Sequence, residues 1–211
     1  MDPARRRAAL TLTVIGLVAA LLLAGIDRLT RERIAQADQQ RALATLTAML
    51  PASDFDNRLL DDRIELMLPG LEQAAQVYRA RYRDKPVAAL VDLVTEHGYS
   101  GDIRLLVAVD PAGTVLGVRV LEHRETPGLG DRIEIERSPW IEGFSGRSVG
   151  NPPAERWAAD RHGGDFDTLT SATITTDAVV DAVLSALLGL AQTEPERLWG
   201  PADGQIQETR K

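Results

Sequence analysis

Hydroxyl side chains are concentrated in one stretch of the sequence, Asp167 to Thr176, which reads D-T-L-T-S-A-T-I-T-T. Five of its ten residues are threonine and one is serine. Such residues commonly cap the first N–H groups of a helix, and this interpretation accounts for Thr175 or Thr176. It does not explain why the hydroxyls begin so far upstream, beside an aspartate. The alternative is a phosphate site, because a helix start offers free N–H groups and partial positive charge, and a threonine oxygen there can be esterified.

A second stretch, H-R-E-T-P-G-L-G from His123 to Gly130, directly follows a predicted strand. Its proline and two glycines predict a tight loop whose backbone N–H groups can lie against a flat ligand, and the alternative is a simple strand-ending turn. Glu125 is expected to be solvated, as exposed loop glutamates are, or else to shape the electric field at a ligand. As a lone histidine, His123 is expected to be structural or solvent-facing. A third stretch, G-Y-S-G-D-I from Gly98, indicates by itself only a turn before a strand.

The composition excludes several classes of function. The absence of cysteine excludes disulfides, thiolate iron–sulfur clusters and cysteine-based zinc sites, and the three histidines have no metal-ligand spacing, so no metal site is expected. A net charge of −7 and a pI near 5.0 argue against nucleic-acid binding. No nucleophile, general base and oxyanion set is recognisable, so we expect no catalytic residue and no independent active site. A redox role would therefore need an organic cofactor.

An uncharged apolar segment of 19 residues, 8–26, follows three arginines near the N-terminus. As a helix it would span roughly 28 Å, close to the hydrocarbon thickness of a bilayer. Positive flanks stay in the cytoplasm, so residues 27–211 are expected on the periplasmic side of a bacterial inner membrane. The alternative, a cleaved signal peptide, fits less well because the apolar segment is long and no A-x-A site follows it.

The remaining pattern predicts an α+β fold with a mainly antiparallel sheet. We expect a helix over 27–50, a short strand in 63–69, two strands in 75–94 around a turn at residues 84–86, and a hairpin in 103–121. Residues 124–175 are expected to form loops over a sheet edge. A helix should begin near Thr176, with an apolar stripe at Val180, Val183, Leu184, Leu187 and Leu188. The polar tail after Glu194 is expected to be loosely ordered.

Together the three stretches resemble RnfG, the FMN-binding protein of the ion-translocating Rnf (Rsx) electron transport complex, and more distantly the C subunit of the sodium-pumping NADH:quinone reductase. The resemblance covers nearly the whole chain, including the basic N-terminus, the single span, the Leu50-Pro51 break and Phe55-Asp56-Asn57, where family members often carry Tyr-Asp-Asn. It implies four regions: a cytoplasmic N-terminus and transmembrane helix (1–26), a juxtamembrane helix and loop (27–57), an FMN-binding domain with flanking helices (58–194) and a polar tail (195–211).

The flavin-attachment pattern of that family is Asp, two variable residues, Ser or Thr, Gly, Ala, Thr. It falls here on Asp167, Thr170, Ser171, Ala172 and Thr173. The resemblance implies that Thr173 carries FMN through a phosphodiester, and that Asp167 is part of what the modifying transferase recognises. Ser171 replaces the usual glycine, so the serine is strained if this position needs a positive φ. The resemblance also places five residues in the flavin pocket, Glu125, Thr126, Gly128, Leu129 and Gly130.

The function implied is that of a membrane-anchored electron-transfer subunit of an ion-translocating oxidoreductase, linking ferredoxin and NAD to ion movement. Its partners would be the other integral and peripheral subunits, the membrane, and a magnesium-dependent transferase that takes FMN from FAD. Two alternatives remain open. A flavin-bearing sensor would be expected to carry further spans or a cytoplasmic effector domain. Only seven residues precede the predicted span, which disfavours the sensor. A non-redox assembly anchor would not require the Thr173 segment.

Overall fold

The computed structural model describes residues 49–51 and 53–201, together with Thr13, Gly16, Ala44 and Thr47. The chain divides into two units, residues 1–44 and 45–211, and all of the described strands belong to the second. Apart from Thr13 and Gly16, the predicted membrane helix over 8–26 lies outside the described residues, as do most of the helix predicted over 27–50 and residues 202–211.

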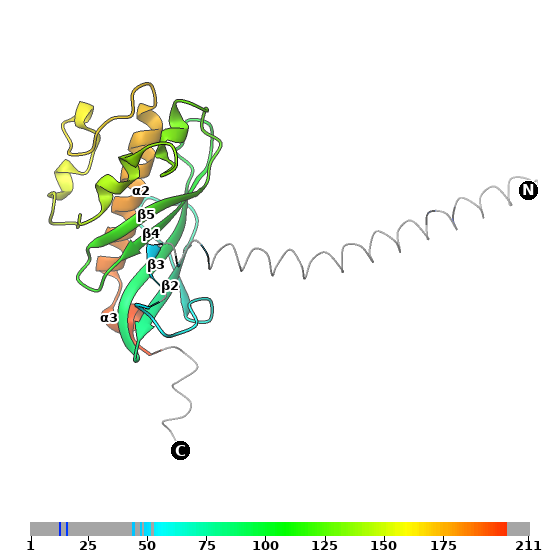
Figure 1. The fold of residues 1–211 in the computed structure, drawn as a ribbon, viewed down its shortest axis with the longest axis vertical. Coiled ribbons are helices and arrows are strands. Elements are labelled where there is room, and N and C mark those ends of the chain that lie inside the picture. Colours follow the sequence, from blue (N-terminus) through cyan, green and yellow to red (C-terminus); the bar gives the residue numbers. More distant parts are fainter. Residues whose placement is uncertain are drawn as a thin grey trace, which may run out of the picture. The chain divides into compact units, whose positions relative to one another are not determined.

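The second unit is built on a five-stranded antiparallel sheet in which each strand pairs with the next along the chain (Figure 1). Its strands are β1 (Arg63–Leu66), β2 (Ala75–Tyr82), β3 (Lys85–Thr95), β4 (Ile103–Val109) and β5 (Val115–Glu122). These strands confirm the predicted antiparallel sheet, including the hairpin in 103–121. The β2–β3 turn lies at Arg83 and Asp84, whose φ angles of 51° and 62° suit a two-residue hairpin loop. It is one residue earlier than predicted, because Pro86 already belongs to β3, beside a bulge.

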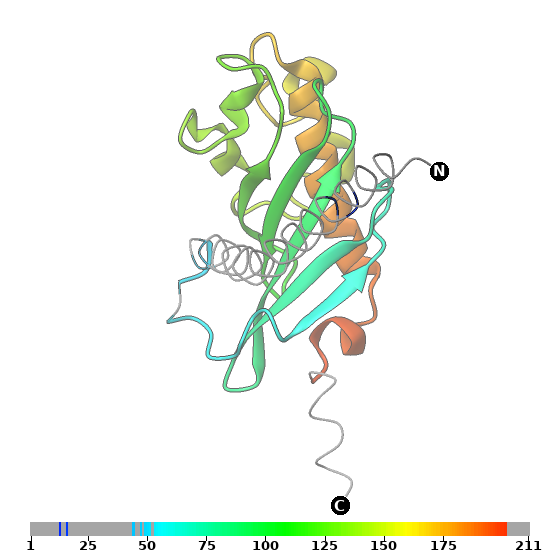
Figure 2. The ribbon, with the colours of Figure 1, turned by 90° about the vertical axis from the view of Figure 1, so that its right-hand side faces the viewer.

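One long helix, α2 (Thr173–Gln192), lies across one face of the sheet (Figure 2). Val180, Val183 and Leu187 of the predicted stripe are buried against it, and Leu184 and Leu188 are half-buried. Within the described part of the chain, α2 alone is long and apolar enough to cross a membrane, but most of it is buried in this core. It is therefore the core helix of the domain. It begins three residues before the predicted Thr176.

The other face of the sheet is covered by the segment 49–60. Leu50 and Leu59 of that segment are buried together with Tyr78, Leu90 and Leu106 of the strands. Burying apolar side chains on both faces explains why β3 and β4 read as nearly continuous apolar runs rather than as alternating patterns.

A long excursion between β5 and α2 contains the 3₁₀ helices η1 (Gly130–Ile133), η2 (Pro139–Phe144), η3 (Ala154–Arg156) and η4 (Asp160–His162). It gathers near the start of α2 (Figure 1). Its own core is aromatic: Phe144 stacks on Phe166 with ring centroids 4.7 Å apart, and Trp157 packs on Phe166 at 4.9 Å. Backbone hydrogen bonds of 2.8 Å join Val115 of β5 to Gly146 and Arg147. The prediction of loops held over a sheet edge is confirmed.

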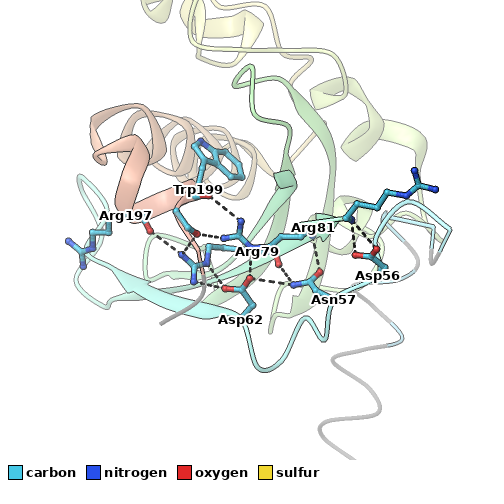
Figure 3. A network of polar contacts seen from close by, with 9 residues as sticks. Asp56, Asn57, Asp62, Arg79, Arg81, Arg197 and Trp199 are labelled. Carbon is cyan, nitrogen blue, oxygen red and sulfur yellow. Dashed lines mark hydrogen bonds and ion pairs between the residues drawn. The ribbon is translucent and has the colours of Figure 1, made fainter. Parts of the chain in front are cut away.

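The polar network of Figure 3 holds the C-terminal end of the described chain against β2. Asp62 is buried between two buried arginines, accepting from Arg79 Nε at 2.6 Å and from Arg81 Nε at 2.7 Å. The same guanidinium groups donate to backbone carbonyls of Arg197 (3.2 Å) and Trp199 (3.1 Å). Residues 195–199 form the helix α3 (Pro195–Trp199). The expectation of a loosely ordered tail from residue 195 is therefore wrong for this segment.

The motif Phe55-Asp56-Asn57 joins the same strand. The Asn57 amide donates to the Arg79 carbonyl at 2.8 Å and accepts from the Arg81 N–H at 2.8 Å, so one side chain replaces a strand partner. The Asp56 carboxylate accepts the N–H of Arg83 at 2.9 Å in the hairpin turn. Both polar residues of the motif therefore fix the segment 53–62 to β2.

Candidate functional site

Helix α2 begins at Thr173 without a capping side chain, since its N-cap residue is Ala172. The prediction that Thr175 or Thr176 is the cap is wrong. The Thr176 hydroxyl donates to the Ala172 carbonyl at 3.0 Å and accepts the N–H of Leu169 at 3.1 Å, which ties the preceding loop to the helix. The N–H groups of the first turn are therefore left for another acceptor.

The turn before the helix contains a residue in the left-handed region. The N–H of Ala172 donates to the Leu169 carbonyl at 2.9 Å, and Ser171, at the third position of this turn, has a φ of 67°. A positive φ at that position is typical of glycine and costs other residues about 1–2 kcal/mol. The condition under which strain at Ser171 was expected, a positive φ, is therefore met. This turn leads directly into Thr173, the first residue of α2.

The Thr173 hydroxyl is half-buried and accepts a hydrogen bond from the guanidinium of Arg161, which lies in η4. A guanidinium can only donate, so its charge lies against the hydroxyl oxygen. Sequence reasoning missed Arg161 because no spacing rule relates it to Thr173. Asp167 and Thr170 of the same stretch are exposed.

Glu125 joins all three stretches that sequence analysis singled out. Its carboxylate accepts the hydroxyl of Thr175 at 2.6 Å and the N–H of Ser100 at 3.0 Å. Gly130 approaches so closely that a Cβ there would lie 2.8 Å from the Glu125 Cβ. With 5% of its surface exposed, Glu125 is buried, and the expectation of a solvated loop glutamate is wrong. The carboxylate instead fastens two loops to the first turn of α2.

The loop 123–130 is tight, as predicted, but its N–H groups are used internally. The Thr126 carbonyl accepts the N–H groups of Leu129 and Gly130, each at 3.1 Å, and Asp131 accepts the N–H of Gly128 at 2.8 Å. These N–H groups are therefore not free to contact a flat ligand, and the expectation that they would be is wrong. Thr126, Gly128 and Leu129 are exposed.

His123 has a structural role, as expected for a lone histidine. Its Nδ1 accepts the N–H of Glu125 at 3.0 Å, and its Nε2 lies 2.7 Å from a carboxylate oxygen of Glu134. Because Nδ1 is an acceptor, Nε2 carries the proton and donates to Glu134. No group of three His, Asp or Glu side chains suited to a metal occurs in the described residues.

A cavity of about 600 Å³ opens beside the stretch 165–169. This volume lies within the range of roughly 300–1,000 Å³ that is usual for small-molecule sites. Among its lining residues are two aromatic side chains and two arginines: Trp140, Phe166, Arg132 and Arg147. The Trp140 indole N–H donates to the Asp167 carbonyl at 2.6 Å, which fixes one wall. Two carboxylates, those of Asp165 and Asp167, also line it, so the cavity offers a flat aromatic surface but no net positive charge. Neither Thr173 nor the loop 125–130 is among its lining residues.

The carboxylate of Asp160 holds the segment between η4 and the cavity. The hydroxyl of Thr168 donates to Asp160, and the N–H groups of Arg161 (2.7 Å) and Thr168 (3.0 Å) donate to the same oxygen. The Thr168 hydroxyl is the largest cause that lowers the pKa of Asp160 below its ordinary value. The loop that carries Arg161 is thereby anchored to the stretch leading to Thr173.

Comparison with known proteins identifies the family. Residues 98–188 match the FMN-binding domain family, and residues 1–49 match the RnfG N-terminal region. A curated relative from Pseudomonas aeruginosa, the G subunit of an ion-translocating oxidoreductase complex, is 41% identical over 99% of this chain and 100% of its own. The chain belongs to the RnfG family of ion-translocating oxidoreductase complexes. Relatives of the same description from Escherichia coli K12 (42% identical, 92% of this chain, 94% of the relative) and Shewanella loihica (38%, 92%, 95%) agree.

This finding confirms the family resemblance seen in the sequence. The FMN-binding match covers Gly98, Glu125 and Thr173, which lie in the three stretches that the structure brings together. The uncapped helix start and the guanidinium of Arg161 fit a phosphate, and the aromatic cavity beside residues 165–169 fits a flat ring. When bound, FMN supplies one- and two-electron redox chemistry that the side chains of this protein lack.

Proposed function

We propose that this chain is a membrane-anchored electron-transfer subunit that carries FMN covalently on Thr173, within a complex that couples electron transfer between ferredoxin and NAD to ion transport. The observation that carries the proposal is the Thr173 hydroxyl, which stands at an uncapped helix start against the guanidinium of Arg161. The family membership supplies the redox context.

The attachment requires an FMN donor, for which we propose FAD and a separate magnesium-dependent transferase. The bond from Thr173 Oγ1 to the FMN phosphorus forms, the P–O–P bond of FAD breaks, and AMP leaves with the electron pair of that bond. The hydroxyl proton passes to a base of the transferase. The phosphodiester keeps one negative charge, which the positive end of α2 favours. The exposed side chain of Asp167 is accessible to a transferase that recognises this motif.

The pocket residues form part of the same proposal. Thr126, Gly128 and Leu129 present an exposed loop surface, while Glu125 and Gly130 lie beneath it against the first turn of α2. The buried carboxylate of Glu125 adds negative charge near Thr173, which would make flavin reduction less favourable. Replacement by glutamine should therefore raise the flavin midpoint potential, whereas a purely structural Glu125 would leave the potential unchanged.

The attachment site is tested by producing the full chain together with the transferase, denaturing it, and recording flavin fluorescence in the gel. Wild type should be fluorescent and gain the mass of one FMN less one water. Thr173→Ala should abolish both signals, and Thr170→Ala, in the same exposed stretch, should keep them. Fluorescence that survives Thr173→Ala would contradict the assignment. Absence of flavin from wild type would instead favour the non-redox anchor.

The proposed topology places the N-terminus in the cytoplasm and residues 27–211 in the periplasm. The chain has no cysteine, so a single introduced cysteine reports its own side of the membrane. Glu155→Cys, at an exposed position of η3, should react with a membrane-impermeant maleimide in intact cells. Ala4→Cys should react only after lysis. The reverse pattern would overturn the orientation. Co-purification with redox subunits, rather than as a lone flavoprotein, would separate the electron-transfer role from a sensor.

A further inference from the structure

One arginine stands against the oxygen atom at which the flavin would be attached. The Arg161 guanidinium donates to Thr173 Oγ1, and in the described part of the chain it forms no ion pair with a carboxylate. Because the guanidinium has donors only, it binds the oxygen through a lone pair and leaves the hydroxyl proton free to depart. Its charge acts on the adjacent Asp160 carboxylate through space but forms no direct ion pair with it, so the guanidinium can still pair with a phosphodiester on Thr173.

Contacts on both sides hold Arg161 in this place. Before it, Asp160 accepts the N–H of Thr168 at 3.0 Å and the hydroxyl of the same residue. After it, His162 Nε2 lies 3.2 Å from a carboxylate oxygen of Asp177, one turn along α2 from Thr173. Each of the three residues of η4 thus makes one contact: Asp160 with Thr168, Arg161 with Thr173, and His162 with Asp177 of α2. The 3₁₀ turn η4 therefore bridges the attachment stretch and the start of α2.

Two carboxylates that contact η4 or belong to it, those of Asp160 and Asp177, have other partners. Asp160 is occupied by the hydroxyl of Thr168, and Asp177 by His162. A phosphodiester on Thr173 Oγ1 would place its non-bridging oxygens one bond beyond the phosphorus, within the space that the Arg161 side chain already reaches. Guanidinium groups bind such oxygens by paired, charge-assisted hydrogen bonds.

We propose that Arg161 is a positioning residue for flavin attachment: it orients the Thr173 oxygen before the bond to phosphorus forms, and afterwards pairs with the phosphodiester. This inference rests on the proposed function and extends it to a residue outside the attachment motif. The group that Arg161 would bind is a phosphate ester on Thr173.

The test uses the full chain, produced with the transferase, in detergent. We compare wild type with Arg161→Ala, Arg161→Lys and the matched control Arg156→Ala, an exposed arginine of the same excursion that pairs with Asp165 at 2.9 Å. Flavin incorporation is followed over time by intact mass, and the attached phosphodiester by its phosphorus NMR shift. The loss of one charge-assisted hydrogen bond should slow incorporation about tenfold in Arg161→Ala. Arg161→Lys should restore most of the rate, because it restores the charge.

The phosphorus resonance should move in Arg161→Ala and stay in place in Arg156→Ala, with all variants melting within a few degrees of wild type. Equal rates in wild type and Arg161→Ala would overturn the inference while leaving Thr173 as the attachment site. A slower rate with an unmoved resonance would also overturn it, since Arg161 would then serve recognition by the transferase. Failure of the proposed function is distinct: wild type itself would then gain no flavin mass.

Discussion

Replacement of Asp62 by asparagine tests whether the buried charge network holds the domain together (Figure 3). Asp62, Arg79 and Arg81 expose 6%, 4% and 6% of their surfaces, so solvent cannot replace a lost partner. Asparagine keeps the shape of the side chain but removes its charge, which leaves two buried guanidinium groups without an anion. Breaking a buried ion pair in this way costs about 3–5 kcal/mol. The melting temperature should fall by roughly 10 °C, since each kcal/mol shifts it by about 2–4 °C at this chain length.

The matched control is Asp92→Asn on the same sheet. Asp92 binds Arg104 by two hydrogen bonds of 2.8 and 2.7 Å, and its hydrogen bond is the largest cause that raises the pKa of Arg104. The Arg104 side chain is 47% exposed, so water can replace the partner and the loss should be about 0.5–1 kcal/mol. Urea unfolding of the full chain in detergent, followed by tryptophan fluorescence, measures both. Equal losses for Asp62→Asn and Asp92→Asn would refute the reasoning from burial.

Three further predictions concern the helix α2 and its surroundings. The pKa of Asp181 lies above its ordinary value, because partial desolvation of this exposed carboxylate, and then the charge of Asp177, disfavour the ionised form. Ionised Asp181 therefore lowers stability as the pH rises through its folded pKa. Asp181→Asn should raise the melting temperature slightly at pH 7 but not at a pH below the ordinary pKa of aspartate, and equal gains at both would contradict this. Ser171→Gly should stabilise by up to about 1 kcal/mol in urea unfolding because it relieves a φ of 67°, whereas a loss would show that the serine is not strained. Gly130→Ala should destabilise the folded domain by about 1–3 kcal/mol, since the new Cβ would lie 2.8 Å from the Glu125 Cβ. An unchanged melting temperature would mean that the loop can move to accommodate the methyl group.

Much of the sheet could be predicted because its information is local. Apolar runs ended by turn residues indicated the strands, and only the β2–β3 turn differs, since Arg83 and Asp84 adopt a conformation that favours glycine or asparagine. The start of α2 was misplaced because the hydroxyls of Thr175 and Thr176 resemble caps. Their actual partners are Glu125 and the preceding loop, and residue type alone does not specify them.

The candidate site was predictable in its residue types but not in its partners. The proposed attachment motif points to Thr173 from seven consecutive residues, whereas Arg161 reaches this threonine from a separate 3₁₀ turn. Glu125 contacts Thr175 across fifty positions of sequence, so its burial follows from the packing of two loops on a helix and not from any periodicity. In the same way, α3 is ordered by distant arginines of β2, and the polar composition of the tail concealed this.

The central claim, a flavin bonded to Thr173, is tested most directly by peptide mapping of the full chain after production with the transferase. Proteolysis and tandem mass spectrometry should find the peptide that contains Asp167 to Thr176 heavier by one FMN less one water, with the fragment ions assigning the added mass to Thr173. Added mass on another hydroxyl of this stretch, or a flavin released intact on unfolding, would contradict the account.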